Sequence, residues 1–219
     1  MKIPMIGQQA GKSYAYILGL YMGDGCVSRQ PEKGSHRFRL NVIDKDFAEY
    51  AMGHLFKLTG RKTSIFQQNG HFWAFSFGWK ALCDHLEEVT DKKKKIPEFV
   101  FGWNREMKQK FIEAQLDSDG YVAVDKKRQV YSMGFKNCDS WFDDFVKLLH
   151  DVGLKTGKIG HQPGRKPGYL DAKRVYINLQ SWLKSGFSFS CGRKQDRIKK
   201  YELRQSSTTN TLGQLKEAV

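Results

Sequence analysis

The feature that most constrains this chain is an acidic motif that occurs twice. Residues 17–25 read ILGLYMGDG and residues 112–120 read IEAQLDSDG, so each segment ends in Asp-Gly. Asp119 follows Asp24 by 95 positions (119 − 24), and the small residues around the two acids keep the same offset. An acidic helix end that is repeated in one chain predicts a pseudo-symmetric molecule with two carboxylates at its centre.

The motif is the first element of a longer repeat. After each copy, alternating apolar and polar residues predict two strands, an amphipathic segment predicts a helix that ends at Gly60 or Gly153, and a second hairpin and a short helix follow. The fold class is therefore α+β, with two pseudo-symmetric αββαββα half-domains. We expect a first half at 1–95, a connector at 96–104, a second half at 105–205 and a polar tail at 206–219 that is loosely ordered or helical only near its end.

The charge of the chain favours a polyanionic partner. Its 219 residues carry 37 Lys and Arg against 23 Asp and Glu, a formal charge of +14, and cations that neutralise phosphates release condensed counterions. The four widely spaced cysteines favour free thiols in a reducing compartment. No stretch approaches the ~20 apolar residues of a membrane span, and no signal peptide is evident. We expect an intracellular protein that is not secreted and has no membrane partner.

The positions of Asp24 and Asp119 are unfavourable for carboxylates. A helix C-terminus carries partial negative charge, and two carboxylates close together repel each other. A divalent cation would offset both costs, so the pair predicts a shared metal site. The alternative is that Asp-Gly is only a common turn dipeptide, and the second copy weakens it. Small residues in each motif let two parallel helices approach closely: Gly19 and Gly23, and Ala114 and Ser118.

Both segments resemble the LAGLIDADG motif, and the element order resembles that of the single-chain, double-motif LAGLIDADG homing endonucleases. Gly19 and Ala114 match the first Gly of the motif, and Asp24 and Asp119 match its last acid. The resemblance spans roughly residues 12–204. It implies that the motif helices form the interface between the halves and that the two sheets form a DNA-binding saddle.

The resemblance also implies the chemistry. Asp24 and Asp119, with Gly23 and Ser118, would bind Mg²⁺ or Mn²⁺, while Ca²⁺ would support binding without cleavage. The substrate would be a long, non-palindromic double-stranded DNA site. A monomer would cut both strands across the minor groove and leave short 3′ overhangs; it would be intron-encoded, and an intein or a free-standing gene stays open.

Further catalytic residues follow from the same resemblance. Asp44 and Asn137, each at the end of the second strand of its half, would lie near the attacking water; the alternative is that each caps the following helix. A central cation would come from Lys94, or a neighbour within 92–95, and from Lys194 or its neighbour Arg193. It would stabilise charge on the phosphate, and the alternative is a solvated basic connector.

Polar residues on the expected strands lie on faces opposite the core, because strand side chains alternate. Arg suits guanine edges and Asn suits adenine, and a phosphate contact is the alternative for each. The residues expected to bind DNA are Arg37, Arg39, Asn41, Gln67, Arg128, Arg165, Lys166, Arg174, Tyr176 and Asn178.

Two other functions on the same scaffold stay open from the sequence. One is an RNA-binding cofactor of intron splicing (a maturase), and the other is a non-cleaving, sequence-specific DNA-binding regulator. Met22 departs from a motif position that is often acidic and that Asp117 keeps. Neither metal-binding acid is lost, so the intact Asp24 and Asp119 favour the nuclease.

Overall fold

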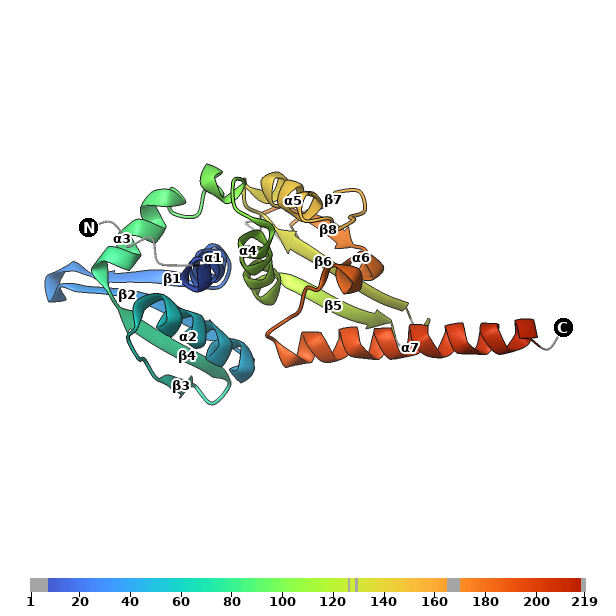
Figure 1. Cartoon of the computed structure of the whole chain (residues 1–219). Coiled ribbons are helices and arrows are strands. Elements are labelled where there is room, and N and C mark those ends of the chain that lie inside the picture. Colours follow the sequence, from blue (N-terminus) through green and yellow to red (C-terminus); the bar gives the residue numbers. More distant parts are fainter. Residues whose placement is uncertain (1–7, 126, 129, 165–169, 218–219) are drawn as a thin grey trace.

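The chain folds into two halves with the same order of elements (Figure 1). The computed structural model describes residues 8–125, 127–128, 130–164 and 170–217, and for residues 8–10 and 207–217 it describes the backbone alone. Arg165 and Lys166 lie outside the described residues. The first half contains α1 (Gln8–Met22), β1 (Cys26–Gln30), η1 (Pro31–Lys33), β2 (Ser35–Val42), α2 (Lys45–Thr59), β3 (Ile65–Gln68), β4 (Phe72–Gly78) and α3 (Lys80–Val89).

The second half repeats this plan after a short 3₁₀ turn, η2 (Glu98–Val100). Its elements are α4 (Arg105–Ser118), β5 (Gly120–Asp125), β6 (Val130–Asn137), α5 (Phe142–Asp151), β7 (Gly160–Gln162), β8 (Ala172–Ile177), α6 (Leu179–Ser185) and α7 (Gly192–Glu217). The sheets have the equivalent antiparallel orders β1-β2-β4-β3 and β5-β6-β8-β7. The α+β class and the duplicated αββαββα plan are thus confirmed.

Each sheet has a core face and an exposed face, as the alternation of its residues predicts. In β2, Phe38 and Leu40 are buried, whereas Arg37, Arg39 and Asn41 are exposed. We call the exposed side of each sheet its outer face. The equivalent strand of the second half, β6, buries Met133 and Phe135 and exposes Lys136.

The two motif helices, α1 and α4, lie side by side at the centre of the molecule (Figure 1). A Cβ on Gly19 would lie 2.5 Å from the carbonyl oxygen of Phe111, and a Cβ on Gly23 would lie 2.5 Å from Cβ of Ser118. Larger side chains at these positions would therefore push the helices apart. The stripe of small residues brings the two backbones together, as expected.

The C-terminal segment differs from the expectation. Helix α7 runs without a break from Gly192 to Glu217, so residues 206–217 continue a helix and do not form a separate loose tail. The polar composition of this segment has no hydrophobic periodicity, so the sequence did not predict a continuous helix there. The segment continues the helix because adding residues to an existing helix costs far less free energy than nucleating a new one.

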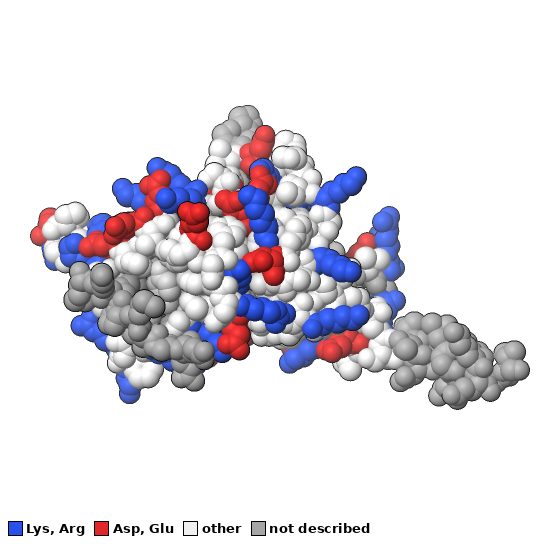
Figure 2. Space-filling view, turned by 45° about the horizontal axis from the view of Figure 1, so that its top comes forward, with Lys and Arg blue, Asp and Glu red and all other residues white. Residues whose placement is uncertain are grey.

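Two properties of the surface bear on partners. Within the described residues, no helix has the length and apolar character needed to cross a membrane. On the side seen in Figure 2, Lys and Arg side chains lie over both halves, with Asp and Glu side chains among them. On this side, the positive charge of the chain is therefore not gathered into one patch.

Candidate active site

The two motif acids lie just beyond the ends of α1 and α4. The backbone of Asp24 leaves α1 through a tight turn in which the Gly25 N–H donates to Leu20 O at 2.8 Å. A Cβ on Gly25 would lie 2.8 Å from that same oxygen, so only glycine fits after Asp24. Asp119 caps α4 and donates its N–H to Gln115 O at 2.9 Å. The Asp-Gly pair thus serves to end a helix tightly with a carboxylate at its tip.

The carboxylates of Asp24 and Asp119 interact with each other. Burial raises the pKa of Asp119 to about 6, and the negative charge of Asp24 contributes to the rise. The pKa of Asp24 is also raised by burial, while Lys194 and Lys93 oppose that rise. A Cβ on Gly23, the residue before Asp24, would lie 3.8 Å from Asp119 Oδ2, so the structure brings together the two acids that the repeat paired.

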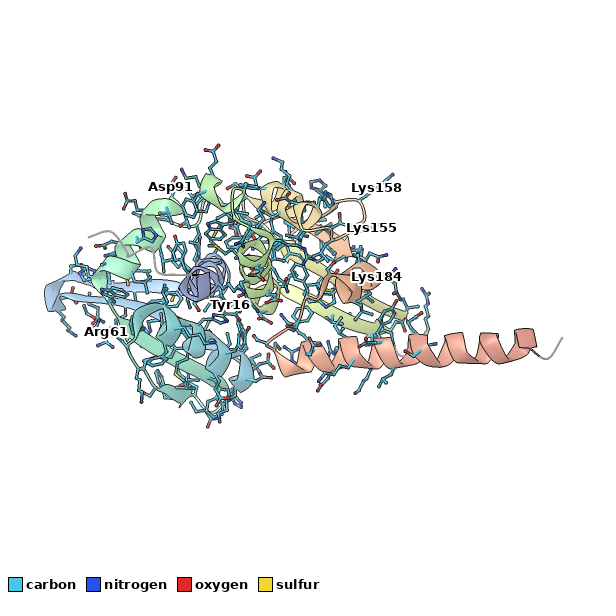
Figure 3. All side chains as sticks on the ribbon, viewed as in Figure 1. Tyr16, Arg61, Asp91, Lys155, Lys158 and Lys184 are labelled. Atoms are coloured by element: carbon cyan, nitrogen blue, oxygen red, sulfur yellow. The ribbon has the colours of Figure 1, made fainter. Side chains whose placement is uncertain are left out.

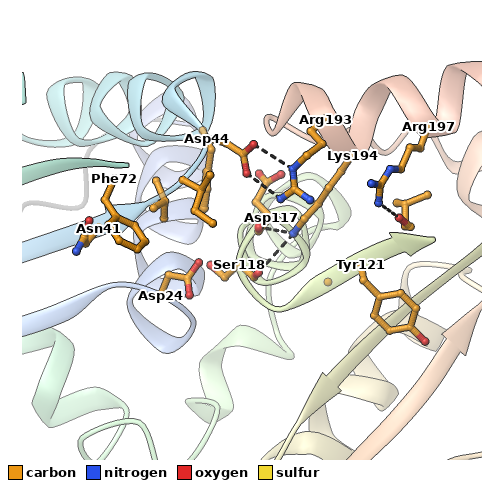
Figure 4. A pocket seen from close by; sticks show the side chains of 15 residues that line it. Asp24, Asn41, Asp44, Phe72, Asp117, Ser118, Tyr121, Arg193, Lys194 and Arg197 are labelled. Atoms are coloured by element: carbon orange, nitrogen blue, oxygen red, sulfur yellow. Dashed lines mark hydrogen bonds and ion pairs between the residues drawn. The ribbon is translucent and has the colours of Figure 1, made fainter. Parts of the chain in front are cut away.

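Two cavities flank the paired helix ends, and each acid lines one of them. Asp24 lines a cavity of about 350 Å³ together with Asp44 and Lys194 (Figure 4). Asp119 lines a second cavity of about 640 Å³ with Lys93 and Asn137. The two acids therefore face separate cavities beside the paired helix ends.

A lysine binds the carbonyl end of each motif helix. Lys93 Nζ donates to Gly23 O at 2.8 Å, and Lys194 Nζ donates to Leu116 O at 2.8 Å and also to Ser118 O at 3.4 Å. These bonds satisfy helix-end carbonyls and place positive charge where the helix dipole is negative. Burial lowers the pKa of both lysines, and nearby acidic groups, Asp24 among them, oppose that effect.

Within residues 92–95, the lysine that contacts the end of the motif helix is Lys93, one of the neighbours that the expectation included, and Lys94 lies further out. The Lys94 side chain is 71% exposed and lies 3.8 Å from Asp91. The connector turns through positive φ at Asp91, Lys92 and Lys93, which carries the Lys93 side chain inward. Side chains bind the backbone of Lys93 at both of its polar atoms: Thr90 Oγ1 accepts from Lys93 N at 3.0 Å, and Trp141 Nε1 donates to Lys93 O at 3.0 Å.

The equivalent residues Asn137 and Asp44 make different contacts. Asn137 Nδ2 donates to Asp119 Oδ2 at 3.0 Å, so Asn137 lies in the site. Asp44 stands at the N-cap position of α2 but makes no capping bond. Its carboxylate accepts two hydrogen bonds from Arg193, at 3.0 and 3.2 Å, which hold the pKa of Asp44 below its usual range. Asp44 therefore links the first half to α7 and does not contact Asp24 through any described hydrogen bond.

The sequence reasoning gave no role to Asp117, which the structure buries. Its carboxylate accepts hydrogen bonds from Tyr16 at 2.9 Å and from both the hydroxyl and the N–H of Ser190, at 2.6 and 2.9 Å. Burial raises the pKa of Asp117 to about 6. This acid fixes the segment that leads into α7, and thereby Lys194, to the second motif helix.

The donor atoms around Asp24 and Asp119 fit a hard divalent cation. Within the described residues no group of three or more His, Cys, Asp and Glu could hold a metal, so oxygen atoms of water and phosphate would complete the coordination. The backbone oxygens of Gly23 and Ser118 already accept from lysines, and each keeps a second lone pair. The mutual repulsion of the two carboxylates is what a cation would relieve.

The first sheet carries three of its expected DNA-binding residues on the outer face and one elsewhere. Arg37, Arg39 and Asn41 are exposed there. Gln67 lies opposite Trp73, which pairs with the buried Val42, so Gln67 belongs to the core face. Its amide donates to Gly70 O at 2.9 Å. Gln67 is exposed but lies on the face opposite Arg39, which the sequence of a four-residue strand could not determine, and its contact with DNA stays a prediction.

The second sheet shows a similar outcome. Arg174 stacks over the ring of Tyr176, at 4.8 Å from its centroid, on the outer face. Asn178 lies beyond β8 and caps α6, accepting from Ser181 N at 2.9 Å, so its assignment to the DNA face was wrong. Arg128 is exposed in the β5–β6 turn, 3.9 Å from Asp125. Lys136 was missed: it alternates with buried Phe135, the same signal that identified Arg39, and it pairs with Arg174 across the strands.

Comparisons with known proteins show which solved structures share this fold. No protein-family model matches the chain. The crystal structure of I-DmoI in complex with DNA and Mn superposes with a TM-score of 0.56 over 81% of this chain and 94% of that one, at 18% identity. The homing endonuclease I-WcaI bound to its DNA recognition sequence gives 0.58 over 88% and 89%, at 10% identity. This chain has the LAGLIDADG homing-endonuclease fold. The N-terminal LAGLIDADG domain of DUF199/WhiA shares it at a TM-score of 0.52 and 13% identity, over 84% and 82%.

Curated relatives of the chain are distant in sequence. An uncharacterized protein of Methanocaldococcus jannaschii is 26% identical over 215 residues, 91% of this chain and 74% of that protein. The homothallic switching endonuclease of Saccharomyces cerevisiae is 30% identical over 172 residues, 67% of this chain. A DNA polymerase of Thermococcus kodakarensis is 23% identical over 176 residues, 78% of this chain. The chain spans 28% of that endonuclease and 10% of that polymerase.

Proposed function

We propose that this protein is a site-specific, metal-dependent endonuclease that cuts both strands of a long, non-palindromic DNA target inside the cell and acts as a monomer. The observation that carries the proposal is the pair of carboxylates, Asp24 and Asp119, just beyond the adjacent ends of two related helices, where the charge of Asp24 helps to raise the pKa of Asp119. The solved structures of I-DmoI and I-WcaI in complex with DNA share this fold and support a DNA substrate.

Asp24, Asp119 and the Gly23 and Ser118 carbonyls would hold Mg²⁺ or Mn²⁺. When bound, the metal supplies an activated water and stabilises the departing 3′ oxygen. Ca²⁺ would bind the same oxygens and support DNA binding alone, because it is larger and less demanding in geometry.

The surrounding side chains would position and stabilise the reacting phosphates. Lys93 and Lys194 hold positive charge beside the acids, where a phosphate gains negative charge during cleavage. Asn137 fixes the orientation of Asp119 through its 3.0 Å hydrogen bond. We assign the cavity of Asp24 to one DNA strand and the cavity of Asp119 to the other, with cleavage across the minor groove and short 3′ overhangs.

The outer faces of both sheets would bind the DNA on either side of the cut. Each half, 1–95 and 105–205, would contact one side of the target. Arg37, Arg39 and Asn41 in the first half and Arg174 in the second stand on these faces, where Arg and Asn can read guanine and adenine edges. Because the two sets differ, the target would be non-palindromic.

A selection from random DNA sequences tests this function. Duplexes bound by the protein in Ca²⁺ would be enriched from a randomised library and then exposed to Mg²⁺ or to EDTA. We expect cleavage of both strands in Mg²⁺ and none in EDTA, with ends that map to short 3′ overhangs. Tight specific binding without nicking in Mg²⁺ or Mn²⁺ would instead identify a regulator. Preferential enrichment of structured RNA from a parallel library would indicate a maturase.

A further inference from the structure

The first half has a basic groove that the two acids do not line. It measures about 460 Å³ and lies where η1 and the start of β2 approach the end of β4 and the start of α3. Among the described residues that line it there is no Asp or Glu. Its cationic residues are Lys33, Arg37, Arg61 and Lys80.

Three of these cations are not neutralised. Lys80 is paired with Asp84 at 2.5 Å. In the described part of the chain, Lys33, Arg37 and Arg61 form no ion pair, and Arg37 donates only to the hydroxyls of Ser35 and Ser76. Three uncompensated positive charges around a concave surface attract a polyanion.

The groove continues the outer face of the first sheet away from the catalytic centre. Asn41 lines the cavity of Asp24, whereas Arg37 lies four residues earlier on β2, a separation of about 13 Å along an extended strand. Figure 3 places Arg61 at the edge of the first half, away from α1. A duplex that follows the outer face from the Asp24 cavity would therefore reach this groove.

Among the described residues, two of the groove's cations have no basic counterpart in the second half. The alignment that pairs Gly60 with Gly153 pairs Arg37 with Val130 and Arg61 with Leu154. Val130 is 54% exposed and Leu154 is buried. The basic groove is therefore an asymmetric feature that the duplication alone does not explain.

We propose that this groove binds the phosphate backbone of the DNA target outside its base contacts, so that the footprint extends further on the side of the first half. The inference rests on the proposed DNA substrate. Phosphate is the ligand class because the groove presents unpaired cations and no carboxylate among its described lining residues, and cation contacts with phosphates do not depend on base sequence.

The test is a thermodynamic cycle that combines substitution of the groove cations with shortening of the DNA duplex. The variant Lys33→Gln/Arg61→Gln would be compared with Lys57→Gln/Lys184→Gln, which removes two exposed lysines from the helices α2 and α6. Affinity would be measured in Ca²⁺ for a selected duplex and for the same duplex shortened at either end. We expect the groove variant to bind the full duplex about tenfold more weakly. Its salt slope should be lower by about one unit for each phosphate that it no longer neutralises.

Shortening the duplex at the end that lies in the groove should weaken wild-type binding as much as the groove substitutions weaken binding of the full duplex. The same shortening should not weaken binding by the groove variant any further. The control variant should show the wild-type sensitivity to shortening. The proposal would be overturned if the affinity losses from substitution and from shortening were additive, or if the control variant lost as much affinity as the groove variant. It would also be overturned if the groove variant lost affinity only for a competing RNA duplex of the same length. If the wild type bound no duplex at all, the proposed function would fail instead.

Discussion

Asn137 and Asp44 occupy equivalent positions in the two halves, yet Asn137 donates to Asp119 whereas Asp44 accepts from Arg193. The carboxamide therefore supports the acid of its own half. The carboxylate instead ties the first half to the start of α7, which carries Lys194. The two sites are chemically non-equivalent within a nearly symmetric scaffold.

Asp119→Asn should stabilise the metal-free protein at neutral pH. The pKa of Asp119 is raised from 3.8 to about 6 on folding, so the native state binds more protons than the unfolded state between these values, and stability falls as pH rises through that window. Allowing for solvent, the gain should be about 1 kcal/mol at pH 7 and vanish below about pH 4. Thermal unfolding in EDTA at several pH values measures it. Because Asp24→Asn relieves the same repulsion, the double variant should gain less than the sum.

Gly19→Ala should destabilise the protein by about 2–3 kcal/mol, because the new Cβ would lie 2.5 Å from Phe111 O at the α1–α4 contact. Gly53→Ala is the matched control. Gly53 lies within α2, and a Cβ there meets no atom within 4 Å, so this change should stabilise by about 0.5–1 kcal/mol. Urea unfolding compares the two, and equal effects would refute the close approach of the motif helices.

Asp117→Ala should destabilise by about 2–4 kcal/mol, since it leaves the buried hydroxyl of Tyr16 and the N–H of Ser190 without their acceptor. Tyr16→Phe removes one of these bonds and should cost about 1 kcal/mol. Chemical denaturation gives both values. A loss for Tyr16→Phe as large as that for Asp117→Ala would contradict the role of Asp117 as the centre of this network.

Lys93→Gln should lower the rate of DNA cleavage about 100-fold while leaving DNA binding in Ca²⁺ intact, because it removes a positive charge beside the acids. Lys94→Gln changes the neighbouring lysine, whose side chain is 71% exposed, and should leave the rate unchanged. Single-turnover cleavage of a selected duplex distinguishes them. The opposite order of effects would restore Lys94 as the central cation.

The sequence was sufficient where the signal is local and repeated. Short-range rules predict the ends of the motif helices, the alternation of residues in β2 and the glycine that ends α2. Each of these patterns recurs in the second half, which strengthened the prediction. Small residues at Gly19 and Gly23 also predicted the helix contact, because only a close approach needs them.

The features that the sequence did not predict depend on interactions that short-range patterns do not encode. Lys93 turns inward because three consecutive residues of the connector adopt positive φ, which no composition rule predicts for Asp and Lys. Gln67 depends on the register of a four-residue strand. The contact of Asp44 with Arg193 could not be predicted, because its partner lies 149 positions away in the chain.

Cleavage by Asp24→Asn and by Asp119→Asn tests the central claim most directly. The measurement is formation of doubly cut product from a selected duplex in Mg²⁺, alongside binding of the same duplex in Ca²⁺. If the two carboxylates hold the catalytic metal, each variant should bind the duplex and fail to cut both strands. Normal double-strand cutting by both variants would contradict the account.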